Sequence, residues 1–188
     1  MKIGLYFGSF NPIHIGHLII ANHFQEFTDL DQVWFVISPQ NPFKKKSSLA
    51  NEFDRLDMAE IAIKDYPSLR TSDIEFRLPK PSYTIDTLIH LEEKYRNDQF
   101  CLIMGSDNLE GINKWKNSEL ILENYPIYVY PRPDFNAEEA YPNVTIVEAP
   151  LMEISSTFIR SAIKENKNIK PMLPHLVWEH LDKLGLYK

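Results

Sequence analysis

The residues whose types and spacing most clearly indicate chemistry are two histidines, His14 and His17, three positions apart. An apolar stretch at 3–7, typical of a buried strand, comes before them, and the apolar segment that begins at Leu18 is typical of a helix. In α/β proteins, ligands bind where a strand gives way to a helix, and the free N–H groups of the helix start favour anions. The histidine pair therefore predicts a site for an anionic ligand.

Two glycines frame the pair. Gly8 is expected to permit a tight turn after the strand, and Gly16 leaves space between the two imidazoles for a ligand to approach the backbone. Two ordinary alternatives stay open: a metal pair, which would need further ligands, or two surface histidines. The spacing matches neither a P-loop nor the dinucleotide-binding fingerprint.

A second cluster lies near the end of the chain, where Ser155, Ser156 and Thr157 begin an expected helix at 156–164. Serine and threonine are favoured helix caps, and Arg160 follows one turn into the helix. A guanidinium group presents a planar fork that suits phosphate oxygens. The cluster therefore predicts a second anion site, unless it is an ordinary cap beside a solvated arginine.

Gly105-Ser106-Asp107 directly follows an expected strand at 100–104. A carboxylate at the carboxyl end of a strand can accept both hydroxyls of a ribose, although the same residues could cap a short helix.

The segment around Tyr83 begins an expected helix at 84–96, with Ser82 or Thr84 as its cap. Its free N–H groups would suit one more negative charge. Trp115, between two lysines, could stack on a flat ring or belong to the core.

Together these motifs resemble the nucleotidyltransferase superfamily, with His14 to His17 similar to its HxGH signature and Ile154 to Arg160 similar to its ISSTxxR motif. Further segments resemble the bacterial nicotinate-nucleotide adenylyltransferases: Pro81 to Leu88, Gly105 to Leu109, Trp115-Lys116 before Glu119, and Arg55-Leu56 followed by Met58-Ala59. The resemblance runs from Ile3 to about Ile163. Two positions depart from the usual pattern: Asn11 stands where Asp is common, and Asn41 to Lys44 replaces a frequent Pro-Pro-His-Lys.

The resemblance implies a Rossmann-like fold of the nucleotidyltransferase type that transfers the adenylyl group of ATP to nicotinate mononucleotide. The products would be nicotinate adenine dinucleotide and pyrophosphate. Mg²⁺ would accompany ATP, coordinated mostly by phosphate oxygens and with no protein metal site. Alternatives are another adenylyltransferase, with dual nicotinate and nicotinamide specificity or acting on phosphopantetheine, and a nucleotide-binding module without catalysis.

The resemblance also implies residue roles. The catalytic residues would be His14, His17, Lys44 and Arg160. The ATP-binding residues would be Gly8, Ser9, Phe10, His14, His17, Gly105, Asp107, Ser155, Ser156, Thr157 and Arg160. The residues binding nicotinate mononucleotide would be Tyr83, Thr84, Trp115 and Lys44.

The elements that must position these residues alternate along the chain. We expect strands at 3–7, 33–37, 70–76, 100–104, 127–130 and 144–148, and helices at 16–27, 51–65, 84–96, 114–123, 156–164 and 174–184. This alternation predicts an α/β fold, with a mainly parallel sheet that has helices on both faces. We expect one domain over 1–188 with a helical tail from about 165, and a mobile lid at 39–50.

Composition narrows the class of protein. The net charge of −6 argues against general nucleic-acid binding, and no apolar run reaches the length that spans a membrane. The single cysteine forms no intramolecular disulfide and no signal peptide precedes the first strand, so a cytoplasmic location is expected. The expected partners are small molecules, and a homo-oligomer stays open.

Overall fold

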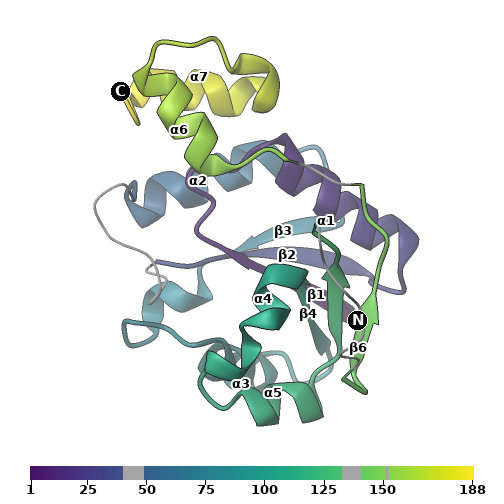
Figure 1. Cartoon of the computed structure of the whole chain (residues 1–188). Helices are drawn as coiled ribbons and strands as arrows, with labels where there is room; N and C mark the ends of the chain where they lie inside the picture. The colour runs from purple at the N-terminus through teal and green to yellow at the C-terminus, as the bar shows by residue number, and fades with distance from the viewer. Residues whose placement is uncertain (40–48, 133–140, 151–152) are drawn as a thin grey trace.

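The computed structural model describes residues 1–39, 49–132, 141–150 and 153–188. Within them, six strands form one sheet in which all paired neighbours are parallel, in the order β3-β2-β1-β4-β5-β6 (Figure 1). The strands are β1 (Lys2–Gly8), β2 (Gln32–Ile37), β3 (Leu69–Ser72), β4 (Gln99–Gly105), β5 (Ile127–Tyr130) and β6 (Val144–Ile146). The predicted parallel α/β sheet is confirmed.

Helices cover both faces of this sheet (Figure 1). α1 (Ile15–Phe27) and α2 (Glu52–Ile63) cover one face, and α6 (Ser156–Lys164) and α7 (His175–Leu184) extend the apolar cluster on that side, with α7 packed against α2 (Figure 1). The other face is covered by α3 (Thr84–Lys94), α4 (Ser106–Glu110) and α5 (Ser118–Asn124). The short 3₁₀ helices are η2 (Ile74–Arg77), η3 (Ile112–Lys114) and η4 (Lys170–Met172).

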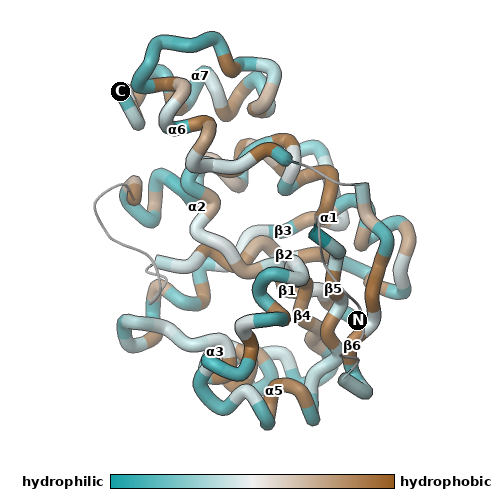
Figure 2. The backbone as a smooth tube through the Cα atoms, viewed as in Figure 1, coloured by the Kyte–Doolittle hydropathy of each residue, from teal (hydrophilic) through white to brown (hydrophobic). Residues whose placement is uncertain are grey.

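The central strands have apolar side chains on both faces because each face packs on helices. On β2, Val33 and Phe35 belong to the core under α1 and α2, whereas Trp34 and Val36 belong to the core under α3. Successive strand residues point to opposite faces, so a strand buried on both sides becomes a continuous apolar run. Figure 2 shows this as hydrophobic colouring concentrated along the inner strands.

The strand order reverses at the pair β1 and β4, which lie side by side in the middle of the sheet. Such a switch point leaves a crevice beyond the carboxyl ends of the two strands, where α/β proteins bind ligands. β1 leads there into the histidine run and β4 into Gly105-Ser106-Asp107. The topology therefore brings two of the predicted motifs to one place.

The strand predicted at 70–76 is wrong in its second half. β3 ends at Ser72, and Ile74–Arg77 forms η2 instead. The Ser72 hydroxyl accepts the N–H of Ile74 at 3.4 Å, which turns the chain out of the sheet. Glu75 is consequently buried and its carboxylate is held by two hydroxyl groups, which a strand would have directed elsewhere.

The helix predicted at 114–123 is also wrong at its start, since α5 begins only at Ser118. Trp115 is extended, with φ −80° and ψ 148°, and Asn117 has the left-handed φ of 51°. Trp115 therefore lies on the connection before α5 and not in the helix. The other predicted strands and helices lie within two residues of the observed ones.

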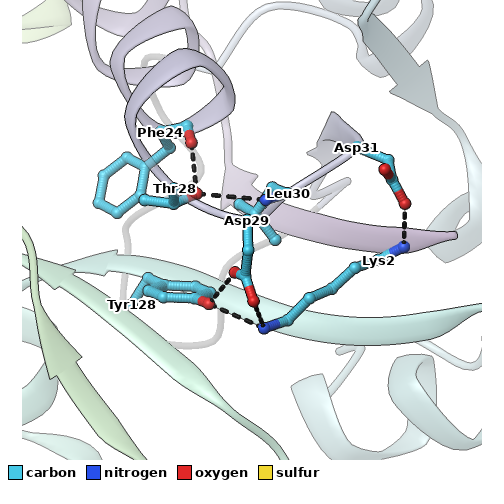
Figure 3. A network of polar contacts seen from close by, with 7 residues as sticks. All are labelled: Lys2, Phe24, Thr28, Asp29, Leu30, Asp31 and Tyr128. Carbon is cyan, nitrogen blue, oxygen red and sulfur yellow. Dashed lines mark hydrogen bonds and ion pairs between the residues drawn. The ribbon is translucent and has the colours of Figure 1, made fainter.

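A polar network closes the opposite, amino-terminal edge of the sheet (Figure 3). Lys2 on β1 donates to the Asp29 carboxylate at 2.6 Å and to the Tyr128 hydroxyl at 2.9 Å, and Tyr128 donates to Asp29. Asp31 accepts the backbone N–H of Lys2 at 2.7 Å. These bonds link β1, the α1–β2 connection and β5, so the polar groups at this edge are used in holding the fold.

None of the helices in the described part of the chain is both long and apolar enough to cross a membrane.

Candidate active site

A cavity of about 1030 Å³ opens at the carboxyl edge of the sheet, next to the switch point between β1 and β4. All but one of the predicted site residues line it: Gly8, Ser9, Phe10, His14, His17, Tyr83, Thr84, Gly105, Asp107, Trp115, Ser155, Ser156, Thr157 and Arg160. Segments from both ends and the middle of the chain thus meet at one cavity. Lys44 lies outside the described residues, as does most of the segment 39–50.

The two histidines form a stacked pair at the start of α1. Their ring centroids are 3.7 Å apart with 22° between the planes. His14 is the N-cap of the helix, and its backbone N–H donates to Nδ1 of His17 at 3.2 Å. The predicted position of both histidines at the handover from strand to helix is confirmed.

Burial shapes the chemistry of His14, which is only 4% exposed. Burial, with a smaller contribution from the positive charge of Arg132, lowers the pKa of His14 from 6.5 to about 4. Its Nδ1 atom is buried without a hydrogen-bond partner. At neutral pH, His14 is therefore a neutral imidazole that offers a hydrogen bond and no charge.

The turn before the histidines is made differently from the prediction. Phe10 has the left-handed φ of 44°, whereas Gly8 does not need a positive φ. A Cβ on Gly8 would come within 2.8 Å of the Phe10 ring, which packs edge-on against the His17 ring at 5.0 Å. Glycine is needed at position 8 for close packing, and the strained backbone lies two residues later.

The start of α6 is capped as predicted and is tied to the histidine run. The Ser155 side chain accepts the N–H of Phe158 at 3.2 Å. The Ser156 hydroxyl donates to the Pro12 carbonyl at 2.9 Å, although the two residues are 144 positions apart. The two helix starts, α1 and α6, therefore face one cavity together, and each places the positive end of a helix dipole there.

Arg160 adds a charge at the same point. Its guanidinium donates to the main-chain carbonyl of Asn11 at 2.8 Å and to the Thr157 hydroxyl at 3.3 Å. These bonds orient the planar group against the loop that precedes the histidines. A guanidinium has five N–H donors, so it can hold this position and also bind phosphate oxygens.

Asp107 lies in the first turn of α4, whose N-cap is Gly105 and has no side-chain capping bond, so the motif begins a short helix without capping it through a side chain. A Cβ on Gly105 would collide with Oδ1 of Asp107, so glycine gives the carboxylate its room. Arg132, beyond the end of β5, lies 3.6 Å from that carboxylate, and its backbone N–H donates to the Ser106 hydroxyl at 2.9 Å. Arg132 also lines the cavity.

The prediction that Ser82 or Thr84 caps α3 is wrong. Tyr83 is the N-cap and makes no side-chain capping bond. The Ser82 hydroxyl instead donates to Glu75 at 2.9 Å, as does the Thr87 hydroxyl. Glu75 is 2% exposed, and burial raises the pKa of its carboxyl group. Sequence reasoning missed Glu75 because it was assigned to a strand.

Trp115 and Lys116 lie against the start of α3. The Lys116 ammonium is 4.9 Å from the centre of the Tyr83 ring and 2.9 Å from the Asp86 carboxylate. Trp115 lines the cavity and is partly buried against the apolar core. An aromatic side chain that is neither fully buried nor fully exposed at a cavity wall suits stacking on a flat ligand.

Arg55 was missed as part of the site's framework. This fully buried guanidinium donates to four main-chain carbonyls: Ser9 at 2.5 Å, Ser38 at 2.8 Å, Ala50 at 3.0 Å and Pro39 at 3.2 Å. It joins the loop after β1 to the end of β2. In the sequence, Arg55 stood out only as part of the family resemblance. Its hydrogen bonds could not be predicted, because any residue type can supply a main-chain carbonyl.

In the described ranges, no three His, Cys, Asp or Glu side chains lie close enough together to hold a metal ion. The carboxylates of Asp107, Glu153 and the buried Glu75 line the cavity. This donor set fits a cation held chiefly by phosphate oxygens and water, which is how Mg²⁺ usually binds beside nucleotides.

Comparison with known proteins identifies the family. A cytidylyltransferase-like family model matches residues 5–162. Over the whole length of both chains, the protein is 57% identical to a protein of Flavobacterium johnsoniae named probable nicotinate-nucleotide adenylyltransferase. The chain belongs to the nicotinate-nucleotide adenylyltransferase family. A relative with the same name from Caldicellulosiruptor bescii is 38% identical, again over both whole chains.

Solved structures of this family share the fold. A Plasmodium falciparum nicotinic acid mononucleotide adenylyltransferase complexed with NaAD is 22% identical, with a TM-score of 0.83 over 99% of this chain and 97% of the other. A crystal structure from Vibrio parahaemolyticus, named as that of a putative nicotinate-nucleotide adenylyltransferase and 24% identical, has a TM-score of 0.73 over 99% of this chain and 94% of the other. The nucleotidyltransferase type of the predicted fold is confirmed.

Proposed function

We propose that this chain transfers the adenylyl group of ATP to nicotinate mononucleotide, releasing pyrophosphate and forming nicotinate adenine dinucleotide in NAD synthesis. The observation that carries the proposal is the convergence of five chain segments on one cavity at the sheet's switch point. The names of full-length relatives at up to 57% identity support the same reaction. The single, buried cysteine is consistent with a cytoplasmic location, which belongs to the proposal.

The nucleophile in this reaction is the phosphate of the acceptor itself. A phosphate monoester has a second pKa near 6, so it is largely dianionic at neutral pH and needs no general base. The lowered pKa of His14 agrees with this, because a weakly basic imidazole removes protons poorly but still donates a hydrogen bond. Catalysis then consists of aligning two polyanions and neutralising their charge.

The triphosphate would lie between the starts of α1 and α6. His14 and His17 would donate to phosphate oxygens, and Arg160, with Ser155 and Thr157, would hold the triphosphate from the α6 side. Bound with ATP, Mg²⁺ would neutralise part of the phosphate charge. Gly8, Ser9, Phe10 and Ser156 would form the surrounding wall, Gly105 and Asp107 would receive the adenosine ribose, and Lys44 would contact the reacting phosphates.

The acceptor would lie against α3. The free N–H groups at Thr84 would bind the nicotinate carboxylate, since the start of a helix favours negative charge. Trp115 would stack on the pyridine ring, and Tyr83 would flank it. These roles are the ones that the resemblance to the family implies, and they are supported by the position of these residues at the cavity wall.

Pyrophosphate release with a panel of acceptors tests the proposal. Purified protein with Mg²⁺ and ATP should release pyrophosphate rapidly with nicotinate mononucleotide, and slowly with nicotinamide mononucleotide and phosphopantetheine. Release only with phosphopantetheine would assign the chain to a different adenylyltransferase. No release with any acceptor would favour a binding module.

A further inference from the structure

The last turn of the chain reaches the loop that carries the histidines. α7 ends at Leu184. Gly185, which follows it, has the left-handed φ of 63°, and the N–H of Leu186 bonds back to the Leu181 carbonyl at 3.1 Å. This turn directs Leu186 and Tyr187 against the core under α1 and α2. The penultimate residue is thereby partly buried, although it lies next to the end of the chain.

The Tyr187 hydroxyl donates to Oδ1 of Asn11 at 2.6 Å. Asn11 is 3% exposed, and the same Oδ1 atom accepts the N–H of Ala50 at 3.1 Å. One side-chain oxygen therefore joins three parts of the chain that are far apart in sequence. The main-chain carbonyl of Asn11 belongs to its peptide bond with Pro12, so anchoring the side-chain oxygen restrains that peptide plane through the Asn11 backbone.

That peptide plane matters because its carbonyl holds Arg160. The guanidinium of Arg160 donates to the Asn11 main-chain oxygen at 2.8 Å, at the wall of the cavity. A chain of contacts thus runs from the Tyr187 hydroxyl through Asn11 to the arginine. Because hydrogen-bond strength depends steeply on geometry, a small rotation of Asn11 would turn the guanidinium.

The surroundings keep Tyr187 a donor. Burial raises the pKa of its hydroxyl above the ordinary 10, although the guanidinium groups of Arg55 and Arg160 act in the opposite direction. A neutral hydroxyl between two positive groups adds no further charge. Tyr187 can therefore orient Asn11 at neutral pH without competing with phosphate for the arginine.

We infer that Tyr187 is a positioning residue of the nucleotide site, which sets the orientation of Arg160 through Asn11. The inference rests on the proposed role of Arg160 in binding the triphosphate. The carboxyl-terminal end of the chain, which carries none of the sequence motifs, then determines how well ATP is held.

Tyr187→Phe tests this because it removes one oxygen and keeps the ring. Tyr128→Phe is the matched control: its hydroxyl also donates to a side-chain oxygen, but at the amino-terminal edge of the sheet (Figure 3). Calorimetric titration with ATP, without acceptor, should show about five- to tenfold weaker binding for Tyr187→Phe. The control should bind ATP within about twofold of wild type, and both variants should bind nicotinate mononucleotide within about twofold.

The ATP affinity of the double variant Tyr187→Phe/Arg160→Lys distinguishes a role through Arg160 from a general effect on the fold. If Tyr187 acts through Arg160, the double variant should lose less ATP affinity than the product of the two single losses. Unchanged ATP affinity in Tyr187→Phe, an equal loss in the control, or multiplicative losses would each overturn the inference. A wild type that binds ATP but forms no product would contradict the proposed reaction, while the titrations would still decide the role of Tyr187.

Discussion

The rings of His14 and His17 stack 3.7 Å apart, with the backbone N–H of His14 donating to Nδ1 of His17. Two imidazolium cations at this distance would repel each other. The pair is therefore suited to at most one positive charge before a ligand binds, which agrees with the pKa of about 4 for His14.

This pKa predicts a pH dependence of stability. Because the pKa of His14 is 6.5 unfolded and about 4 folded, the unfolded chain binds more protons between these values. The free energy of unfolding should thus fall as the pH drops from about 6.5 towards 4, by up to roughly 3 kcal/mol from this residue. Urea titrations of wild type and His14→Gln at several pH values should show a difference that is constant above pH 7 and changes below 6.5. A difference that stays constant down to pH 4 would contradict the burial argument.

His17→Ala should lower turnover by roughly 10²–10³-fold, since it removes one donor aimed at transition-state charge. It also leaves the His14 N–H without its acceptor, so stability should fall by about 1 kcal/mol. Steady-state kinetics and thermal unfolding of the same preparation check both parts. Near-normal turnover would remove His17 from the mechanism, and a collapse of the melting temperature would make it a packing residue.

Arg160→Lys should weaken ATP binding with little effect on the acceptor. A lysine cannot donate both to the Asn11 carbonyl and to the Thr157 hydroxyl while presenting a planar fork to phosphate. Separate calorimetric titrations with ATP and with nicotinate mononucleotide measure this. An equal loss for the two substrates would show that Arg160 does not serve the triphosphate specifically.

Arg55→Met should destabilise the fold by about 3 kcal/mol or more, because it leaves four carbonyl groups without their buried donor. Arg70→Met is the matched control, since Arg70 is an exposed arginine on β3 and should change stability by less than about 0.5 kcal/mol. Denaturant unfolding compares the two. Equal midpoints for both variants would mean that the guanidinium of Arg55 does not hold the loop.

The sequence predicted the parts of the site that lie where a strand ends or a helix starts. His14, Ser155 and Asp107 stand at such junctions, and local pattern and capping chemistry were enough to place them on one edge. The residues that hold the junctions together were beyond prediction. Within the described residues, the hydrogen bonds of the Arg55 side chain go to main-chain carbonyls, and Tyr187 bonds to a residue 176 positions away. A local sequence pattern predicts neither contact.

The two errors in secondary structure have the same origin. Glu75 and Trp115 follow apolar patterns that suit a strand and a helix, but tertiary contacts decide their conformations. Glu75 turns inward to bind Ser82 and Thr87, and the left-handed Asn117 delays the start of α5. Both residues line the cavity, where function rather than local propensity selects the backbone.

Specificity for the acceptor should depend on the start of α3. We expect nicotinate mononucleotide to be preferred over nicotinamide mononucleotide by about 10- to 10³-fold in kcat/KM, since one or two charge-assisted bonds distinguish a carboxylate from an amide. Trp115→Ala should weaken both substrates together and leave their ratio nearly intact. Equal use of the two acceptors would exclude a carboxylate site at Thr84.

The fate of a labelled phosphorus tests the central claim most directly. With nicotinate mononucleotide and ATP labelled at the α-phosphate, the account predicts that all transferred label appears in nicotinate adenine dinucleotide. Pyrophosphate should form in equal amount and without label. Label in free AMP with no dinucleotide would contradict adenylyl transfer by this site. In a parallel reaction with ATP labelled at the γ-phosphate, transfer of the label to the acceptor would contradict it as well.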